Sequence, residues 1–173
     1  TYNLAAHEEI RNRLGWLTVP EKQAALVPGL EAFRDECLKA GLKHVFVLGM
    51  GGSSLAPEVM SLAFGPDIPE DSGLSLQIID TTNPDEILMR EKSVSLKDTT
   101  FIVSSKSGGT SETLSAFKYF WQKPEVELGD EAGRHFVAIT DPSTSLEKLA
   151  KEKNFLKVFN GPPDVGGRYS VCT

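Results

Sequence analysis

Cysteine and histidine are scarce in this sequence, and long apolar runs are absent from it. Its 173 residues include two cysteines, Cys37 and Cys172, and three histidines, in spacings that match neither a disulfide framework nor a metal site. We therefore expect no metal and a reducing, cytoplasmic setting. No apolar run approaches the roughly 18 residues of a membrane span, and no signal-peptide pattern occurs, so we expect no membrane partner.

An excess of positive charge is absent as well. The formal net charge is −6 at pH 7, which argues against a nucleic-acid partner because nucleic-acid-binding surfaces are basic. The residues are 40% apolar and 24% charged, which is typical of one globular domain with a real core. Because the sequence begins at Thr1 rather than Met and stops at Thr173 with no sign of a natural ending, we expect a fragment of a longer protein.

Helical and strand patterns alternate along most of the chain. Two helices are expected first, over residues 4–17 and from Pro20 to about Ala40, as an accessory layer within residues 1–42. Apolar runs typical of buried parallel strands follow at 44–48, 74–79, 99–103, 135–139 and 156–159. Helical patterns separate these runs, at 55–64, 84–92, 114–121 and after residue 144.

This alternation predicts an α/β fold over residues 43–173, a three-layer αβα sandwich with a five-stranded parallel sheet, Rossmann-like. Asn83 before Pro84 and the spacing of Thr144 and Glu147 are typical of helix starts. Residues 123–133 are polar and contain a proline, so we expect a surface connection there. In such sheets ligands bind beyond the carboxyl ends of the strands, where two Gly/Ser-rich turns are expected.

The turn after the third strand, residues 104–113, is the most informative stretch. It reads Ser-Ser-Lys-Ser-Gly-Gly-Thr-Ser-Glu-Thr and leads into a helix, so backbone N–H groups and the positive end of the helix dipole are available to an anion. Its hydroxyls and its one ammonium group add donors, and its glycines let the backbone come close. The ligand that we infer is a phosphate monoester on a small molecule. Ser, Thr and Gly are also ordinary turn residues, which remains the alternative.

The turn after the first strand, Gly49-Met50-Gly51-Gly52-Ser53-Ser54, permits two interpretations. Its glycines suggest dinucleotide binding, and Asp80 stands where a ribose-binding acid would be expected. That match is loose, because the third small residue of the fingerprint falls at Ser54, and a P-loop is disfavoured further because neither turn ends in Gly-Lys-Ser/Thr. We favour a turn in which glycine serves the geometry while Ser53 and Ser54 stand beside a helix end.

Three motifs follow one another in the chain: Gly51-Gly52-Ser53, then residues 105–113, then Gly166-Gly167-Arg168-Tyr169-Ser170. Together they resemble the phosphoglucose isomerase family, within the wider sugar isomerase (SIS) fold. The resemblance covers roughly residues 40–173 and implies a SIS sugar-phosphate-binding domain. The sequence around the first motif is most similar to the isomerase part of bacterial bifunctional transaldolase/phosphoglucose isomerases.

The resemblance also implies which residues form the site. The substrate phosphate would be bound by Gly52, Ser53, Ser105, Lys106, Ser107 and Thr110. Arg168 would be the active-site arginine that stabilises negative charge on the developing enediolate, a role that suits its planar, permanently charged group. We interpret Glu112 as a helix cap rather than a catalytic acid.

The activity implied is interconversion of glucose 6-phosphate and fructose 6-phosphate through an enediol(ate), in glycolysis and gluconeogenesis, without metal or organic cofactor. The glutamate base, the ring-opening histidine and the lysine of the family lie beyond the position matching Thr173. His7, His44 and His135 are expected to be structural or solvent-facing instead. The alternatives are a non-catalytic SIS-type sugar-phosphate sensor and an isomerase for another sugar phosphate. Homodimers are common in the family, so we expect a homodimer of the full-length protein.

Overall fold

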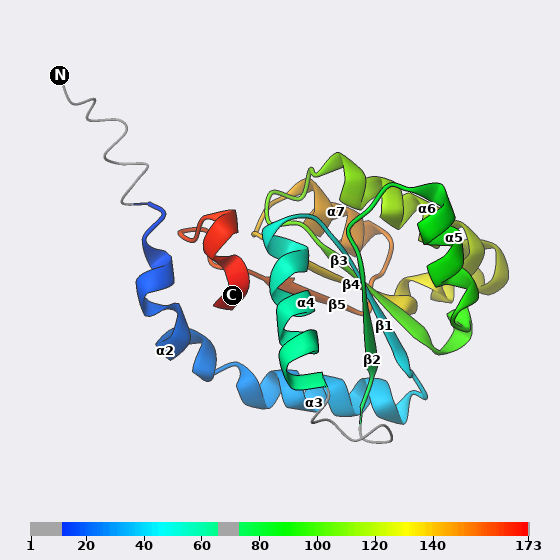
Figure 1. Cartoon of the computed structure of the whole chain (residues 1–173), viewed down its shortest axis with the longest axis horizontal. Coiled ribbons are helices and arrows are strands. Elements are labelled where there is room, and N and C mark those ends of the chain that lie inside the picture. Colours follow the sequence, from blue (N-terminus) through cyan, green and yellow to red (C-terminus); the bar gives the residue numbers. More distant parts are fainter. Residues whose placement is uncertain (1–11, 66–72, 173) are drawn as a thin grey trace.

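A five-stranded parallel sheet forms the centre of the fold in the computed structural model, which describes residues 12–65 and 73–172 (Figure 1). The strands run in the order β2-β1-β3-β4-β5. They are β1 (His44–Gly49), β2 (Ser75–Ile79), β3 (Thr99–Ser104), β4 (Phe136–Thr140) and β5 (Lys157–Asn160). The expected α/β fold with five parallel strands is therefore confirmed, with each strand end within one residue of its prediction.

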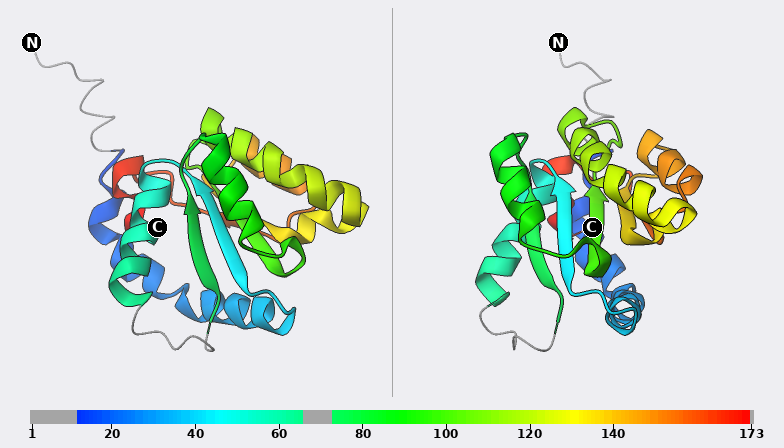
Figure 2. Two further views of the ribbon diagram at one scale, coloured as in Figure 1. Left: turned by 45° about the vertical axis from the view of Figure 1, so that its right-hand side comes forward. Right: turned by 90° about the vertical axis from the view of Figure 1, so that its right-hand side faces the viewer.

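Helices cover both faces of the sheet. The helix after β1 is α4 (Gly52–Phe64), and those after β2, β3 and β4 are α5 (Pro84–Lys92), α6 (Ser111–Leu128) and α7 (Ser145–Glu152). In the left view of Figure 2, α4 lies on one side of the sheet and α5 and α6 lie on the other. Right-handed crossovers require this arrangement, because the chain leaves β1 towards one edge of the sheet and returns from β2 towards the other.

An aromatic cluster between the sheet and α6 forms the core. Phe46, Phe101 and Phe136 come from the neighbouring strands β1, β3 and β4, and each is completely buried. The ring centroids of Phe101 and Phe136 lie 5.0 Å apart, and Phe120 of α6 stacks on Phe101 at the same separation. Such contacts add to the large apolar area that each ring buries, so this side of the sheet is the more heavily packed one.

The N-terminal helices differ from the prediction. Instead of one helix from Pro20 to Ala40, the chain forms α2 (Val19–Ala24) and α3 (Val27–Lys39). The single helix is wrong because Pro28, in the first turn of α3, has no N–H to donate to the carbonyl of Ala24. Figure 1 shows α3 running below α4 and the sheet. The ring of Phe33 in α3 packs edge-on against the ring of Phe159 in β5.

The helix predicted over residues 4–17 falls mostly outside the described residues. Its described end, residues 12–17, is not α-helical but forms a turn, a bridge and the start of η1 (Gly15–Thr18). The bridge pairs Leu14 antiparallel with Val165, which comes after β5. This long-range pairing satisfies backbone groups that a helix would have bonded locally.

A second correction concerns residues 123–133, which were expected to be a surface connection. α6 instead continues through Pro124 to Leu128, and η4 (Gly129–His135) follows. Pro124 is buried, so packing outweighs the missing hydrogen bond to the carbonyl of Phe120. No helix in the described part of the chain is long and apolar enough to cross a membrane.

The predicted helix starts at α5 and α7 are confirmed. The Asn83 side chain accepts a hydrogen bond from the N–H of Asp85 at 3.0 Å. The Thr144 hydroxyl accepts one from the N–H of Glu147 at 3.2 Å. Each cap satisfies one of the first-turn donors that a helix leaves unpaired.

Candidate functional site

The turns after β1 and β3 lie side by side at the carboxyl edge of the sheet. Gly49, the last residue of β1, is the register partner of Ser104, the last residue of β3. The order in which the chain adds strands changes side here, because β2 is added on one side of β1 whereas β3, β4 and β5 are added on the other. Open α/β sheets bind ligands at such a switch point. The two turns that the sequence singled out therefore flank the expected position of a ligand.

In the turn after β1, α4 begins at Gly52, three residues earlier than predicted, which places Ser53 in the first helical turn. Gly51 before it has a φ of 57°, a conformation that suits glycine. The Ser54 hydroxyl is buried and donates to the carbonyl of Gly51 at 3.1 Å. Ser54 therefore supports the turn itself, whereas Ser53 remains available to a ligand.

In the turn after β3, two hydroxyls of the predicted phosphate site bond to each other. Ser105 is buried, and its Oγ lies 3.0 Å from Oγ1 of Thr110. Thr110 precedes α6, and its side chain makes no capping hydrogen bond within the described residues. The exposed Ser107 accepts a long hydrogen bond, 3.4 Å, from the N–H of Gly109. The first-turn N–H groups of α6 are therefore not capped by Thr110.

Lys106, from the same turn, extends towards the ends of β4 and β5. Its Nζ donates to Oδ1 of Asp141 at 2.6 Å and to the carbonyl of Pro162 at 2.8 Å. The side chains of Lys106 and Asp141 are 17% and 21% exposed. A half-buried pair at this distance is held together more strongly than a surface ion pair. The Lys106 ammonium thus has a carboxylate partner within the chain.

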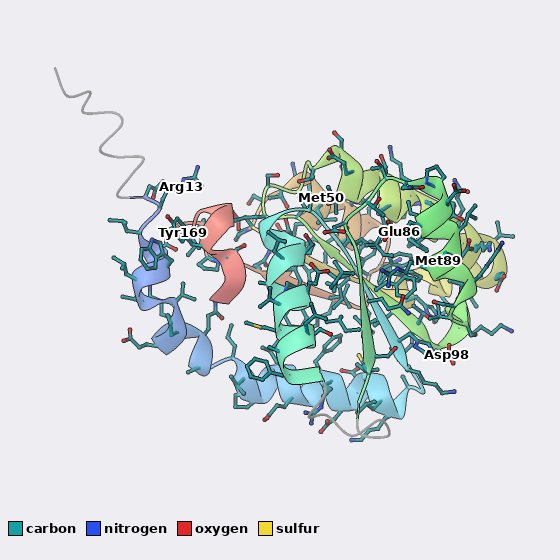
Figure 3. The ribbon with its side chains drawn as sticks, viewed as in Figure 1. Arg13, Met50, Glu86, Met89, Asp98 and Tyr169 are labelled. Atoms are coloured by element: carbon teal, nitrogen blue, oxygen red, sulfur yellow. The ribbon has the colours of Figure 1, made fainter. Side chains whose placement is uncertain are left out.

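The third motif packs against the start of α4. It forms η5 (Gly167–Cys172), where the Ser170 hydroxyl donates to the carbonyl of Gly167 at 2.7 Å. The ring of Tyr169 stacks on Trp16 with centroids 5.1 Å apart. Figure 3 shows Tyr169 on this short helix and Met50 in the turn before α4. The side chain of Arg168 lies outside the described residues, but the backbone of its motif is at the site.

A cavity of about 1230 Å³ opens at this edge and continues along the face of the sheet that α4 covers. Gly52, Ser53 and Lys106 line it, whereas Ser105, Ser107 and Thr110 are not part of its lining. Asp141 and Ser170 also line it. None of the sequence motifs includes Asp141. Its position directly after β4 is a signal that could have found it, because the carboxyl ends of the strands of a parallel sheet meet at one edge.

Two of the histidines lie at the opposite edge of the sheet, at the start of β1 and directly before β4. His44 hydrogen-bonds the hydroxyl of Ser75 at 2.7 Å, and His135 hydrogen-bonds the carbonyl of Thr99 at 2.9 Å. His7 lies outside the described residues. Within residues 12–65 and 73–172, no three His, Cys, Asp or Glu side chains gather as a metal site would require. Cys37, in α3, is a free cysteine and is buried.

Comparison with known proteins adds independent findings. Residues 33–173 match a family described as phosphoglucose isomerase. A curated relative, a glucose-6-phosphate isomerase of Thermus thermophilus, is 32% identical over 170 residues, and the match covers 98% of this chain and 39% of the relative. The chain thus spans about two fifths of the length of that relative.

Solved structures agree with that match. A hypothetical protein of Thermus thermophilus superimposes with a TM-score of 0.84 at 30% identity, over 98% of this chain and 39% of the other. A glucose-6-phosphate isomerase of Chlamydia trachomatis superimposes with a TM-score of 0.69 at 25% identity, over 98% and 29%. Both similarities extend across the sheet and the helices on its two faces.

Proposed function

The chain belongs to the phosphoglucose isomerase family, and we propose that it is the sugar-phosphate-binding part of a glucose-6-phosphate isomerase. The full-length protein would interconvert glucose 6-phosphate and fructose 6-phosphate by moving a proton between adjacent carbons through an enediol(ate). One observation carries this proposal. Three motifs far apart in the sequence converge at the switch point, through the Gly49–Ser104 register and the packing of Gly52 on Gly167.

The two turns suit a phosphate monoester in particular. The Ser105 and Thr110 hydroxyls share one hydrogen bond, and since each carries one proton, the second proton is available to a phosphate oxygen. The uncapped N–H groups at the start of α6 and its dipole favour the same charge. Ser53, with the N–H of Gly52, would contact the phosphate from the α4 side. Ser107 would add a hydroxyl from the exposed tip of the turn.

The sugar would extend into the part of the cavity that Gly52, Ser53 and Lys106 line, and Arg168 would stabilise the negative charge of the enediolate. This chain spans 39% of the length of its Thermus relative. We place the catalytic base and the ring-opening groups in the remaining part of the full-length protein. The proposal involves neither a metal nor an organic cofactor, because the arginine supplies the stabilising charge. It includes residues 1–42 as an accessory layer, residues 43–173 as the sugar-phosphate domain, and a homodimeric enzyme of the cytoplasm.

Calorimetric titration of the full-length protein with fructose 6-phosphate tests the binding step. Inorganic phosphate should compete and unphosphorylated fructose should not bind, because the turns recognise the phosphate. A coupled assay for glucose 6-phosphate then tests turnover. Saturable binding without turnover would identify the sugar-phosphate sensor instead, and turnover of another hexose phosphate alone would identify a different isomerase. A fused transaldolase domain remains a prediction that the sequence of the full-length protein tests.

A further inference from the structure

Lys106 joins three segments that each follow a different strand. Its main chain belongs to the turn after β3, its ammonium bonds Asp141 directly after β4, and the same ammonium bonds the carbonyl of Pro162 after β5. An ammonium group has three protons, so two of them are committed to these contacts. The side chain that the sequence predicts as a phosphate ligand therefore points to protein partners in this structure.

The partner carboxylate is itself held in place from several sides. The N–H of Asp141 donates to the carbonyl of Lys106 at 3.1 Å, so the two residues are connected through the main chain as well as through their charges. The N–H of Gly161 donates to the carbonyl of Thr140 at 2.9 Å, and a Cβ added to Gly161 would lie only 3.3 Å from Oδ1 of Asp141. Asp141 thus stands between the phosphate turn and the segment after β5.

That segment leads directly to the third motif. After Pro162 the chain makes a turn, in which the N–H of Val165 donates to the Pro162 carbonyl at 3.3 Å, and η5 follows two residues later. The Pro162 carbonyl accepts from both Lys106 and Val165. The position of the Pro162 carbonyl therefore affects where η5, which contains Arg168, lies.

We propose that Asp141 is a positioning residue of the phosphate site: its carboxylate holds the Lys106 ammonium on the Pro162 carbonyl and so connects the phosphate turn to the segment that carries Arg168. The inference rests on the proposed function and extends it to a residue with no assigned role. It also changes the role of Lys106. Because Asp141 balances its charge, the phosphate is bound by the N–H and hydroxyl groups of the two turns, while the ammonium orders the segment after β5.

This role and a direct phosphate contact by Lys106 predict different patterns for Asp141→Asn and Lys106→Met. If the ammonium binds phosphate, Asp141→Asn releases a cation towards the ligand and phosphate binds more tightly, whereas Lys106→Met weakens phosphate binding. If the pair positions the segment, Asp141→Asn and Lys106→Met remove the same connection. The two changes then have similar effects, and the double variant is no worse than either single variant.

Hydrogen exchange of the full-length protein measures the positioning without reference to catalysis. We expect the amides of Gly161 and Val165 to exchange about tenfold faster in Asp141→Asn, in Lys106→Met and in the double variant, since a hydrogen bond to a charged group is lost. Amides of β3 should be unchanged, which shows that the sheet is folded. Glu131→Gln is the matched control, since it removes an exposed carboxylate that pairs with Arg134 on η4.

Kinetics and titration with inorganic phosphate complete the test. In the two single variants kcat for fructose 6-phosphate should fall about tenfold with a smaller change in KM, because the arginine segment is displaced more than the phosphate turn. Unchanged exchange at Gly161 and Val165, additive losses in the double variant, or tighter phosphate binding in Asp141→Asn would each overturn the positioning role. An inactive wild-type enzyme would count against the proposed function alone, because the exchange experiment does not depend on turnover.

Discussion

The backbones of Gly52 and Gly167 are in direct contact. A Cβ atom added to Gly52 would lie 2.1 Å from the carbonyl oxygen of Gly167, a separation that no side chain can adopt without movement of the backbone. Gly52 is the first residue of α4 and Gly167 the first residue of η5, and the two backbones approach so closely only because Gly52 has no side chain. This contact places the third motif beside the turn after β1.

Gly52→Ala should accordingly destabilise the protein, by about 1–3 kcal/mol in the free energy of unfolding, because the obstacle is backbone and not a flexible side chain. Urea unfolding of the full-length protein measures the loss. Gly29→Ala in α3 is the control, since nothing lies within 4 Å of its added Cβ and alanine is the better helix former. Wild-type stability for Gly52→Ala would mean that the two backbones are further apart.

The two neighbouring glycines of the phosphate turn should respond differently to alanine. Gly108 has a φ of 70°, and its added Cβ would lie 2.6 Å from Cβ of Thr144, whereas Gly109 has nothing within 4 Å. We expect Gly108→Ala to weaken binding of inorganic phosphate about tenfold or more through distortion of the turn. Gly109→Ala should bind nearly as the wild type does. Calorimetry on both variants makes the comparison, and equal losses would show that the turn adapts.

Removal of the paired hydroxyls should weaken binding without unfolding the protein. Ser105→Ala combined with Thr110→Ala removes both members of one hydrogen bond, so neither is left unsatisfied, and stability should change little. Affinity for fructose 6-phosphate should fall about tenfold to a hundredfold, because hydrogen bonds to a charged phosphate are strong. Ser115→Ala, at an exposed position of the same helix, is the control. Unchanged affinity in the double variant would remove these hydroxyls from the site.

Substitution of Arg168 should lower turnover more than binding. Arg168→Ala in the full-length enzyme is expected to reduce kcat by about a hundredfold or more with a small change in KM, because the charge that the arginine stabilises develops only on the way to the enediolate. Arg168→Lys should restore only part of the rate, since an ammonium lacks the planar fork. Steady-state kinetics with fructose 6-phosphate decides the matter. An equal loss of kcat and of affinity would indicate ground-state binding.

Glu91 of α5 is hydrogen-bonded to Tyr119 of α6, and this contact should shift the titration of the tyrosine. The Tyr119 hydroxyl donates to Glu91 at 2.7 Å, and this bond, together with burial and the carboxylate charge, raises the pKa of Tyr119 to about 12. Glu91→Gln should bring the pKa of Tyr119 down towards the ordinary value of about 10. Ultraviolet titration of tyrosinate measures the change. Tyr119→Phe, which removes the titrating group, identifies the signal, and an unshifted midpoint in Glu91→Gln would contradict the link.

The same carboxylate should make stability depend on acid pH. Burial acts to raise the pKa of Glu91, but hydrogen bonds from Lys123 and Tyr119 outweigh it and lower the pKa below its ordinary value. A lowered pKa in the folded state means that the stabilisation is present above the unfolded value of about 4.3 and is lost as the pH falls through the folded one. Urea unfolding between pH 7 and pH 3 should therefore lose less stability in Glu91→Gln than in the wild type. The same pH dependence of stability in the wild type and in Glu91→Gln would contradict a lowered pKa of Glu91.

Two prolines show why helix boundaries could not be predicted from the sequence pattern alone. Pro28 divides the predicted N-terminal helix into α2 and α3, whereas Pro124 stands inside α6 without ending it. The local cost is the same in both cases, one missing N–H and a ring that crowds the preceding turn. The difference is that Pro124 is buried in the packing of α6, and that packing is invisible in the neighbouring sequence.

The site shows the same division. Ser53, Ser105 and Thr110 could be proposed as phosphate ligands from the sequence, because they stand in strand-to-helix turns of motifs that resemble those of the family. The position of Asp141 after β4 indicates only the edge of the sheet on which it lies. Its ion pair with Lys106 could not be predicted, because Lys106 is distant along the chain and meets it only where β3 and β4 pair.

The amino-acid sequence by itself determined the five strands, the order of the helices between them and the two turns, because continuous apolar runs, caps and glycines act over a few neighbouring residues. The tertiary structure alone decided which of those turns meet, which way Lys106 points and how η5 rests on α4. Those outcomes depend on strand order and on contacts between residues far apart in the chain, and no local pattern encodes them.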